Sequence, residues 1–322
     1  MTQIYGTLGP RCEDEGILKQ MFQAGMTGIR INLSHTDLQS SAELIGRVQR
    51  AAESCGIVPQ LLMDMQGPEL RLGKVEQEIF LAAGSTCALD LLPLPEQVLP
   101  WLIPGQQMLL DDGKLLLEVL AEGRFAVLRG GPVKSRKSIA LPGCPLHPPT
   151  LTEKDLQNIA LAAQTGITGL MQPFVRDAQD LRNVRLALEH AGAGHIELFA
   201  KIENMDGVEH LNELIPECDE IVIARGDLGN AMPLWELPAV QKQISECCRA
   251  AGRRFMVVTQ MLASMEHSAV PTRAEVNDIF QAVLSCAASV MVTGETAAGE
   301  YPVEVIRYLK NTAAQAEKLL PV

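Results

Sequence analysis

Short hydrophobic runs alternate with helical periodicity along most of this chain. Apolar runs of about 4–8 residues are typical of buried strands, whereas apolar residues three and four apart are typical of amphipathic helices. The run Ile4 to Leu8 precedes a helical pattern near Glu13 to Ala24, and Gly28 to Leu33 precedes another near Leu38 to Ser54. The remaining predicted strands are Pro59 to Met65, Ile167 to Phe174, Ile196 to Lys201, Ile221 to Ala224, Phe255 to Thr259 and Val290 to Thr293.

This alternation predicts an α/β fold, the (β/α)₈ or TIM barrel, in which each of about eight strands is followed by a helix. One connection differs, because residues 72 to 140 contain short strand-like pieces and turn signals such as Asp112-Gly113 and Gly130-Gly131 but no long helical period. We therefore predict that residues 1–71 and 141–322 form the barrel. Residues 72–140 are expected to form a small all-β domain inserted after the third strand.

Composition and charge narrow the class of ligand. The 322 residues carry a formal net charge of -12, which argues against a general nucleic-acid surface and favours a small-molecule ligand. The N-terminus lacks a basic leader region and no apolar stretch is long enough for a bilayer, so we expect a cytoplasmic protein that binds neither nucleic acid nor membrane. The 8 cysteines are scattered without Cys-x-x-Cys spacing, which favours reduced thiols.

Charged residues follow two of the predicted strands. Lys201 alternates with Glu203 after one apolar run, and Arg225 alternates with Asp227 after the next, so each pair is expected on one side of an extended chain. The carboxyl ends of barrel strands build the active site in this fold. A lysine and two carboxylates there suit Mg²⁺ and a phosphate or carboxylate better than a packed core. Other predicted strand ends carry Arg30, Asn32, Ser34, Asp64, Arg176, Thr259, Thr293 and Glu295, the first three sharing one face.

The motifs around these residues resemble those of the pyruvate kinase family over essentially the whole chain. The matching segments are Thr7-Leu8-Gly9-Pro10, Arg30-Ile31-Asn32-Leu33-Ser34-His35, Gly67-Pro68-Glu69-Leu70-Arg71, Leu110-Asp111-Asp112-Gly113, Leu141-Pro142-Gly143, Lys201-Ile202-Glu203-Asn204, Ala224-Arg225-Gly226-Asp227-Leu228-Gly229, Thr259-Gln260-Met261-Leu262, Pro271-Thr272-Arg273-Ala274-Glu275 and Gly294-Glu295-Thr296-Ala297. The resemblance implies glycolytic transfer of a phosphoryl group from phosphoenolpyruvate to ADP or another nucleoside diphosphate, with Mg²⁺ and K⁺ as cofactors. It also implies that the inserted residues 72–140 act as a mobile lid.

The resemblance also implies roles for particular residues. Lys201, Thr259 and Arg30 would be catalytic, with Arg30 on the phosphoryl oxygens and Thr259 linked to protonation of the enolate. Gly226 and Asp227 would bind the substrate carboxylate together with Thr259. Glu203 and Asp227 would bind Mg²⁺. The implied K⁺ ligands are Asn32, Ser34, Asp64 and the Met65 carbonyl, and Glu69 matches the acidic residue of K⁺-dependent members. The implied nucleotide-binding residues are His35, Arg71, Asp112 and Lys137.

Departures from the family pattern fall toward the acceptor. Gln66 stands where lysine is usual, and Ser40, Pro173, Thr293 and Ala298 also differ from the common residues. Two alternatives therefore stay open. The first is a Mg²⁺-dependent enzyme that handles enolpyruvate or pyruvate, either as a lyase or as a phosphotransferase with a non-nucleotide acceptor. The second is a phosphoenolpyruvate sensor without turnover, but a sensor has no evident need for Lys201. Because the sequence stops one helix after the last predicted strand, we expect no C-terminal effector domain and no regulation by sugar phosphates. A homodimer through the barrel is left open.

Overall fold

The computed structural model describes residues 1–111, 113–144 and 148–320. The chain forms two compact units. The first comprises Met1–Gly67, Thr150–Leu228 and Trp235–Val322, and the second comprises Pro68–Pro149 and Gly229–Leu234. Each unit has its own buried core and is described by itself.

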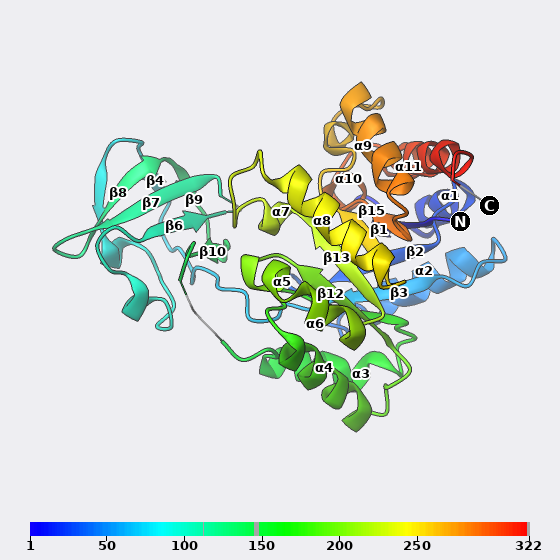
Figure 1. The fold of residues 1–322 in the computed structure, drawn as a ribbon, viewed down its shortest axis with the longest axis horizontal. Coiled ribbons are helices and arrows are strands. Elements are labelled where there is room, and N and C mark those ends of the chain that lie inside the picture. The colour runs from blue at the N-terminus through cyan, green and yellow to red at the C-terminus, as the bar shows by residue number, and fades with distance from the viewer. Residues whose placement is uncertain (112, 145–147, 321–322) are drawn as a thin grey trace. The chain divides into compact units, whose positions relative to one another are not determined.

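The first unit is a closed parallel barrel, as the alternating pattern predicts (Figure 1). Around the barrel the strands follow the order β1-β15-β14-β13-β12-β11-β3-β2, and neighbouring strands are parallel. The strands are β1 (Gln3–Thr7), β2 (Gly28–Asn32), β3 (Gln60–Asp64), β11 (Gly169–Gln172), β12 (Glu197–Ile202), β13 (Glu220–Ala224), β14 (Arg254–Val258) and β15 (Ser289–Met291).

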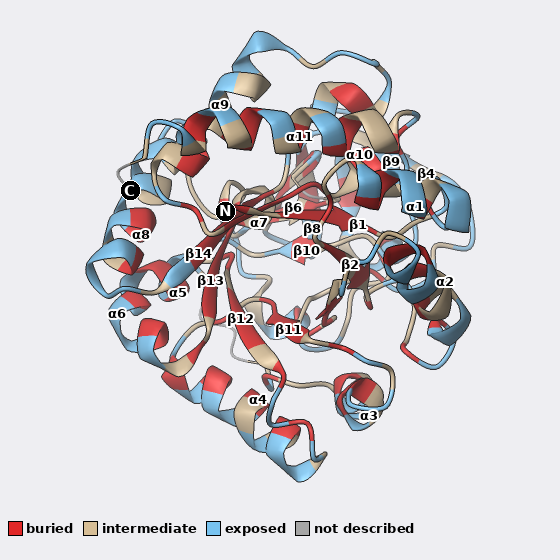
Figure 2. Cartoon of the chain, turned by 90° about the vertical axis from the view of Figure 1, so that its right-hand side faces the viewer, coloured by how far each residue is buried: buried red, intermediate tan, exposed pale blue. Residues whose placement is uncertain are grey.

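Helices surround these strands and expose their outer faces, as Figure 2 shows. Their inner faces are apolar; α1, for example, buries Leu18, Met21 and Phe22. The helices are α1 (Glu15–Gln23), α2 (Ala42–Glu53), α3 (Glu153–Ala162), α4 (Ala178–His190), α5 (Met205–Glu209), α6 (Leu211–Leu214), α7 (Arg225–Leu228), α8 (Leu237–Ala250), α9 (Arg273–Leu284), α10 (Gly294–Ala297) and α11 (Pro302–Glu317).

Local sequence explains where helices begin. Thr152 caps α3 by accepting the amide N–H of Asp155, whose carboxylate in turn accepts the Thr152 N–H. Thr272 and Glu275 form the same reciprocal pair at α9. Each capping box satisfies amide groups that a helix start would otherwise leave without a partner.

The barrel interior is filled by alternate residues of the strands. Its apolar cluster contains Tyr5, Leu62, Met171, Phe199, Val222, Ala224, Met256, Val258 and Met291. Successive side chains of a strand point to opposite faces. Asp64, two residues after Leu62, and Lys201, two residues after Phe199, therefore point inward at the carboxyl ends of β3 and β12.

The second unit is all-β. A five-stranded sheet has the order β10-β6-β7-β8-β5, and β4 pairs with β9. Phe125, Leu117 and Met108 lie in its buried core. The strands are β4 (Ile79–Leu81), β5 (Thr86–Ala88), β6 (Gln107–Leu110), β7 (Leu115–Leu120), β8 (Arg124–Arg129), β9 (Gly131–Val133) and β10 (Ile139–Ala140). The predicted domain boundaries and the lid role stay predictions.

Across the described ranges, none of the helices is both long enough and apolar enough to cross a bilayer.

Candidate active site

A lysine lies between two buried carboxylates at the carboxyl end of the barrel interior. Lys201 Nζ is 2.8 Å from Glu203 Oε1 and 3.3 Å from Asp64 Oδ1. The carboxylates of Asp64 and Glu203 are almost fully buried, whereas 13% of the Lys201 side chain stays exposed. The ammonium group is therefore fixed by protein charges and still reaches the opening of the barrel.

Arg30 adds a second cation to this cluster. Its Nε and Nη2 atoms both lie 2.6 Å from Asp64 Oδ2, so one carboxylate oxygen bridges two guanidinium nitrogens. Arg30 Nη1 makes a longer contact of 3.4 Å to the Thr7 hydroxyl. Arg30 pairs with Thr7 on one side and Leu62 on the other in the barrel register, which places it beside the inward-facing residues of β1 and β3.

Charges within the cluster shift the pKa values of Asp64 and Lys201 against the effect of burial. Burial by itself raises the pKa of Asp64, but the charges of Lys201 and Arg30 outweigh burial and hold that pKa below its ordinary value. Burial lowers the pKa of Lys201, but Asp64 and Glu203 more than offset this and the pKa lies above its ordinary value. Two cations and two carboxylates thus balance one another before any ligand binds.

Glu203 is oriented through both carboxylate oxygens. Oε1 pairs with Lys201, and Oε2 accepts the backbone N–H of Phe174 at 2.9 Å. Phe174 has a φ of +53°, a left-handed conformation that is uncommon outside glycine. Backbone strain of this kind concentrates at functional sites.

Asp227 lies in the short helix α7, immediately after β13. Its charge contributes to the raised pKa of Lys201, after the larger contributions of Asp64 and Glu203. The prediction that Arg225 and Asp227 alternate along an extended chain was wrong, because residues 225–228 turn into a helix. Strand pairing ends at Ala224, opposite Val258, so the ladder does not keep the chain extended beyond that point.

Thr259 follows β14 in a strained conformation. Its φ is +80°, which is a rare value for a β-branched residue and costs about 1–3 kcal/mol. Arg225 holds the Thr259 carbonyl oxygen with Nη2 at 2.7 Å and Nε at 3.2 Å, while Arg225 Nη1 pairs with Asp278 at 2.6 Å. A Cβ atom on Gly226 would lie 3.0 Å from Thr259 Cγ2, so glycine permits this close approach.

The residues that the resemblance assigns to K⁺ lie around the ends of β2 and β3. Asn32 Oδ1 accepts the Ser34 N–H at 3.1 Å, because the chain turns after β2 ends at Asn32. Ser34 therefore does not continue the face of Arg30 and Asn32, and the prediction that all three share one face was wrong. Asp64 Oδ1 is buried and accepts no hydrogen bond within the described residues, apart from its ion pair with Lys201. The Met65 N–H donates to the Met171 carbonyl oxygen at 3.1 Å.

The predicted nucleotide residues fall in different units. His35 is exposed in the first unit, whereas Arg71 and Lys137 belong to the second. Arg71 pairs with Glu69 at 2.6 Å, and Lys137 pairs with Asp111 at 2.7 Å. Asp112 lies outside the described residues. The nucleotide site stays a prediction.

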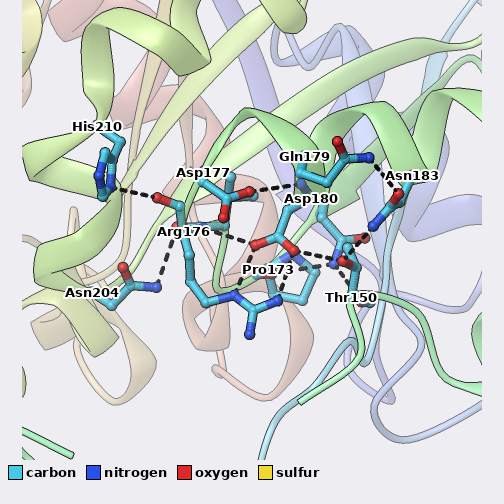
Figure 3. Close-up of polar contacts among 11 residues, drawn as sticks. Thr150, Pro173, Arg176, Asp177, Gln179, Asp180, Asn183, Asn204 and His210 are labelled. Carbon is cyan, nitrogen blue, oxygen red and sulfur yellow. Dashed lines mark hydrogen bonds and ion pairs between the residues drawn. The ribbon is translucent and has the colours of Figure 1, made fainter. Parts of the chain in front are cut away.

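Several polar strand ends have structural partners. Arg176 pairs with Asp180 in the connection between β11 and α4 (Figure 3). Glu295 is buried and accepts the N–H groups of Leu262, at 3.1 Å, and Thr293, at 2.6 Å. These groups brace the loops around the Lys201 cluster. Asp180 and the Phe174 N–H were not predicted as site groups, because no sequence motif marks an acidic residue within a helix or a backbone amide.

A hollow of about 450 Å³ lies at the opposite, amino-terminal end of the barrel. Gln3, Tyr5, Glu197 and Arg254 are among the residues that line it. Arg254 is paired with Glu197 at 2.8 Å and lies 3.6 Å from Glu220. This hollow thus lies away from the Lys201 cluster, and in barrels of this fold the carboxyl ends of the strands form the active site.

The closed barrel and the Lys201 cluster define the class, a (β/α)₈ barrel with a charged centre at the carboxyl ends of its strands. Comparison with known proteins gives the family. The family description "Pyruvate kinase, barrel domain" matches residues 1–306. The chain belongs to the pyruvate kinase family.

Individual relatives of the chain carry the name of the same family. The chain is 37% identical over 99% of its length to "Pyruvate kinase" of Geobacillus stearothermophilus, 57% of which is covered. It is 39% identical over 98% of its length to "Pyruvate kinase" of Methylorubrum extorquens, with 69% of that protein covered, and 33% identical to "Pyruvate kinase" of Leishmania mexicana, with 67% covered. The chain thus spans little more than half the length of some curated relatives.

Proposed function

We propose that the chain transfers the phosphoryl group of phosphoenolpyruvate to ADP or another nucleoside diphosphate, giving pyruvate and the nucleoside triphosphate with uptake of one proton. The observation that carries this proposal is the Lys201 ammonium, fixed between Asp64 and Glu203 and accessible at the opening of the barrel. Family membership and the names of the relatives support it.

Lys201 and Arg30 would stabilise negative charge on the substrate. Phosphoryl transfer depends mainly on positioning and on neutralising charge at the transferring oxygens. Asp64 lies 2.6 Å from Arg30 nitrogens and 3.3 Å from Lys201 Nζ, so it holds both cations near one another. Because the groups are already oriented, little reorganisation is needed when the enolate develops.

Glu203 and Asp227 are the proposed ligands of Mg²⁺. Within the described residues no cluster of three or more His, Cys, Asp or Glu side chains forms a cage. Two carboxylates fit Mg²⁺, which is commonly bound by one or two carboxylates together with substrate oxygens. When bound, this cation would neutralise charge on the phosphoryl oxygens. Asn32, Ser34, Asp64 and the Met65 carbonyl are the proposed K⁺ ligands, and the buried Asp64 Oδ1 supplies a hard oxygen there.

The substrate carboxylate is assigned to the backbone of Gly226 and Asp227 and to the Thr259 hydroxyl. Gly226 allows close packing on Thr259, whose carbonyl is fixed by Arg225. The strained backbone of Thr259 and the bonds of Arg225 to its carbonyl oxygen fix this residue, which suits a group linked to protonation of the enolate.

The acceptor side leaves an alternative to a nucleoside diphosphate. Pro173 replaces the common serine, and a Cβ atom on Gly67 would lie only 2.5 Å from Pro173 Cγ, so the proline ring packs directly on this loop. Ser40 bonds to Asp37 within its own turn at 2.8 Å. These contacts concern residues that differ from the family pattern and favour testing acceptors other than ADP.

A coupled lactate dehydrogenase assay tests the reaction with phosphoenolpyruvate, Mg²⁺, K⁺ and a panel of nucleoside diphosphates. We expect pyruvate to form only when a nucleoside diphosphate is present. Pyruvate released equally with and without every diphosphate would reject the nucleotide acceptor, and absence of turnover with all of them would reject the kinase reaction.

The metal assignment has its own test. Glu203→Gln and Asp227→Asn each remove one of two proposed carboxylate ligands, so both should weaken Mg²⁺ or Mn²⁺ binding by about 10-fold or more. Calorimetric titration measures this, with Glu246→Gln on the exposed face of α8 as the control. If both variants bound the cation as tightly as the parent, the site would be wrongly assigned.

A further inference from the structure

The connection between β11 and α4, residues 173–177, is anchored near its end by a largely buried ion pair (Figure 3). Arg176 Nε lies 2.9 Å from Asp180 Oδ2, and Nη2 lies 2.7 Å from Oδ1. Asp180 Oδ2 also accepts the backbone N–H of Arg176 at 3.0 Å, and Oδ1 accepts the Thr150 hydroxyl at 2.5 Å. Asp180 therefore binds both the side chain and the backbone of Arg176.

The carbonyl groups of the same connection are bound from α5 and its flanks. Asn204 Nδ2 donates to the Val175 carbonyl oxygen at 3.3 Å, and His210 Nδ1 lies 3.1 Å from the Arg176 carbonyl oxygen. A Cβ atom on Gly207 would lie 2.6 Å from the Val175 oxygen, so α5 packs tightly on this backbone. Asn204 directly follows Glu203, which ties the connection to the carboxylate beside Lys201.

The opposite end of the connection reaches Glu203 itself. Phe174 is left-handed, with φ at +53°, and donates its N–H to Glu203 Oε2 at 2.9 Å. A change of Phe174 to the ordinary negative φ would reorient this peptide and move the N–H from the carboxylate. Glu203 would then keep its contact with Lys201 but lose the group that sets its rotation.

We propose that Asp180 is a positioning residue for the reaction, because its bonds to Arg176 keep Phe174 left-handed and its N–H on Glu203. Asp180 acts through Phe174 and Glu203 and does not touch the substrate. This inference rests on the proposed function, in which Glu203 is a ligand of the divalent cation. Asp180 lies in the first turn of α4, a position that by itself would not affect metal affinity. The inference gives this residue such an effect.

The test compares Asp180→Asn with Glu217→Gln in the full chain. Asn keeps the shape of Asp180 but removes the charge that binds Arg176. Glu217→Gln removes the charge of the partly exposed partner of Arg182, an arginine that is also on α4. Mn²⁺ binding without substrate, hydrogen exchange of a peptide containing Phe174 in metal-free protein, and kcat and KM are measured. We expect Asp180→Asn to weaken Mn²⁺ binding by about 5-fold or more, speed exchange at Phe174 and lower kcat by about 10-fold, with KM for phosphoenolpyruvate changed less.

The outcomes separate this inference from the proposed function. If Glu203→Gln weakens Mn²⁺ binding while a folded Asp180→Asn does not, the positioning role alone is overturned. If Glu203→Gln binds Mn²⁺ like the parent, the metal assignment fails and the inference fails with it. Should Asp180→Asn fail to fold, Thr150→Val removes the hydroxyl that donates to Asp180, together with the longer bond of 3.2 Å that this hydroxyl accepts from Asn183 Nδ2, and should give a smaller change in the same direction. Unchanged exchange and unchanged Mn²⁺ binding in that variant would overturn the inference.

Discussion

The two ends of the barrel interior both bury charged groups, but they balance them differently. At the carboxyl end, Asp64 bridges Arg30 and Lys201, and its pKa stays below the ordinary value although burial opposes this. At the amino end, burial raises the pKa of Glu220 to about 7, because the Ser289 hydroxyl and Arg254, 3.6 Å away, compensate only in part.

This difference fits the ligand site proposed at the carboxyl end and a structural role for the charges at the amino end. Arg254 is shared between Glu197 and Glu220, so its charge is already used within the amino end. The carboxyl end holds two cations beside carboxylates and keeps 13% of each cationic side chain exposed. Charges that stay ionised and accessible can act on a phosphoryl group, whereas a buried carboxyl group close to neutrality mainly affects folding.

The largest expected effect concerns the carboxyl end. Lys201→Met removes the ammonium that acts on charge developing during transfer, so kcat should fall by about 10²-fold or more with a smaller change in KM. Steady-state kinetics with phosphoenolpyruvate and the preferred diphosphate measure both constants. Lys242→Met, which removes an exposed lysine paired with Glu246, is the control and should leave both unchanged. Turnover near that of the parent would remove Lys201 from the mechanism.

The second prediction uses the pKa of Glu220. This pKa rises from 4.5 in the reference state to about 7 in the folded protein, so between these values the folded state holds a proton that the unfolded state has lost. The contribution of Glu220 to stability is thus fully present below pH 4.5 and is lost as pH rises through about 7. Glu220→Gln cannot titrate and avoids this loss. The free energy of unfolding of the variant minus that of the parent should therefore increase by about 2 kcal/mol from pH 5 to pH 8.

Urea unfolding at the two pH values measures this difference. The control is Glu213→Gln, which changes an exposed residue of α6 and should show the pH dependence of the parent. An equal pH dependence in Glu220→Gln and the parent would show that the Glu220 carboxyl group titrates normally. Turnover should be unchanged, since Glu220 lies at the start of β13 and Asp227 lies beyond its other end.

The sequence predicts the barrel and much of the site because both depend on short-range patterns. The closed barrel confirms the alternation of strands and helices, and Lys201 and Glu203, which their spacing of two residues predicts on one side of the chain, lie 2.8 Å apart. The contacts of Asp64 with Lys201 join residues far apart in the chain, and no local pattern contains them. The roles assigned to these residues stay predictions.

Three features were beyond a reading of periodicity. The left-handed backbone of Phe174 and Thr259 depends on tertiary hydrogen bonds, because neither residue type favours positive φ. Glu220 starts a strand predicted from Ile221 onward, and only closure of the barrel brings it beside Ser289 and Arg254. Such features follow from assembly of the strands and not from the sequence of any one of them.

The smallest expected effect tests whether Arg254 belongs to the amino end alone. Arg254→Gln leaves Glu220 without its cation, so a charged Glu220 should become less favourable while a protonated one is hardly affected. Because Arg254 is partly exposed, we expect a loss of only about 1 kcal/mol at pH 8 and unchanged kcat. At pH 5 the loss should be below about 0.5 kcal/mol, because there it comes mainly from the exposed pair with Glu197. Arg182→Gln, which removes another exposed arginine from its ion pair, should cost less than about 0.5 kcal/mol at both pH values. An equal loss for Arg254→Gln at the two pH values would mean that Arg254 stabilises the barrel by packing or through Glu197 instead of by its charge on Glu220, and a fall in kcat would show that the two ends of the barrel are coupled.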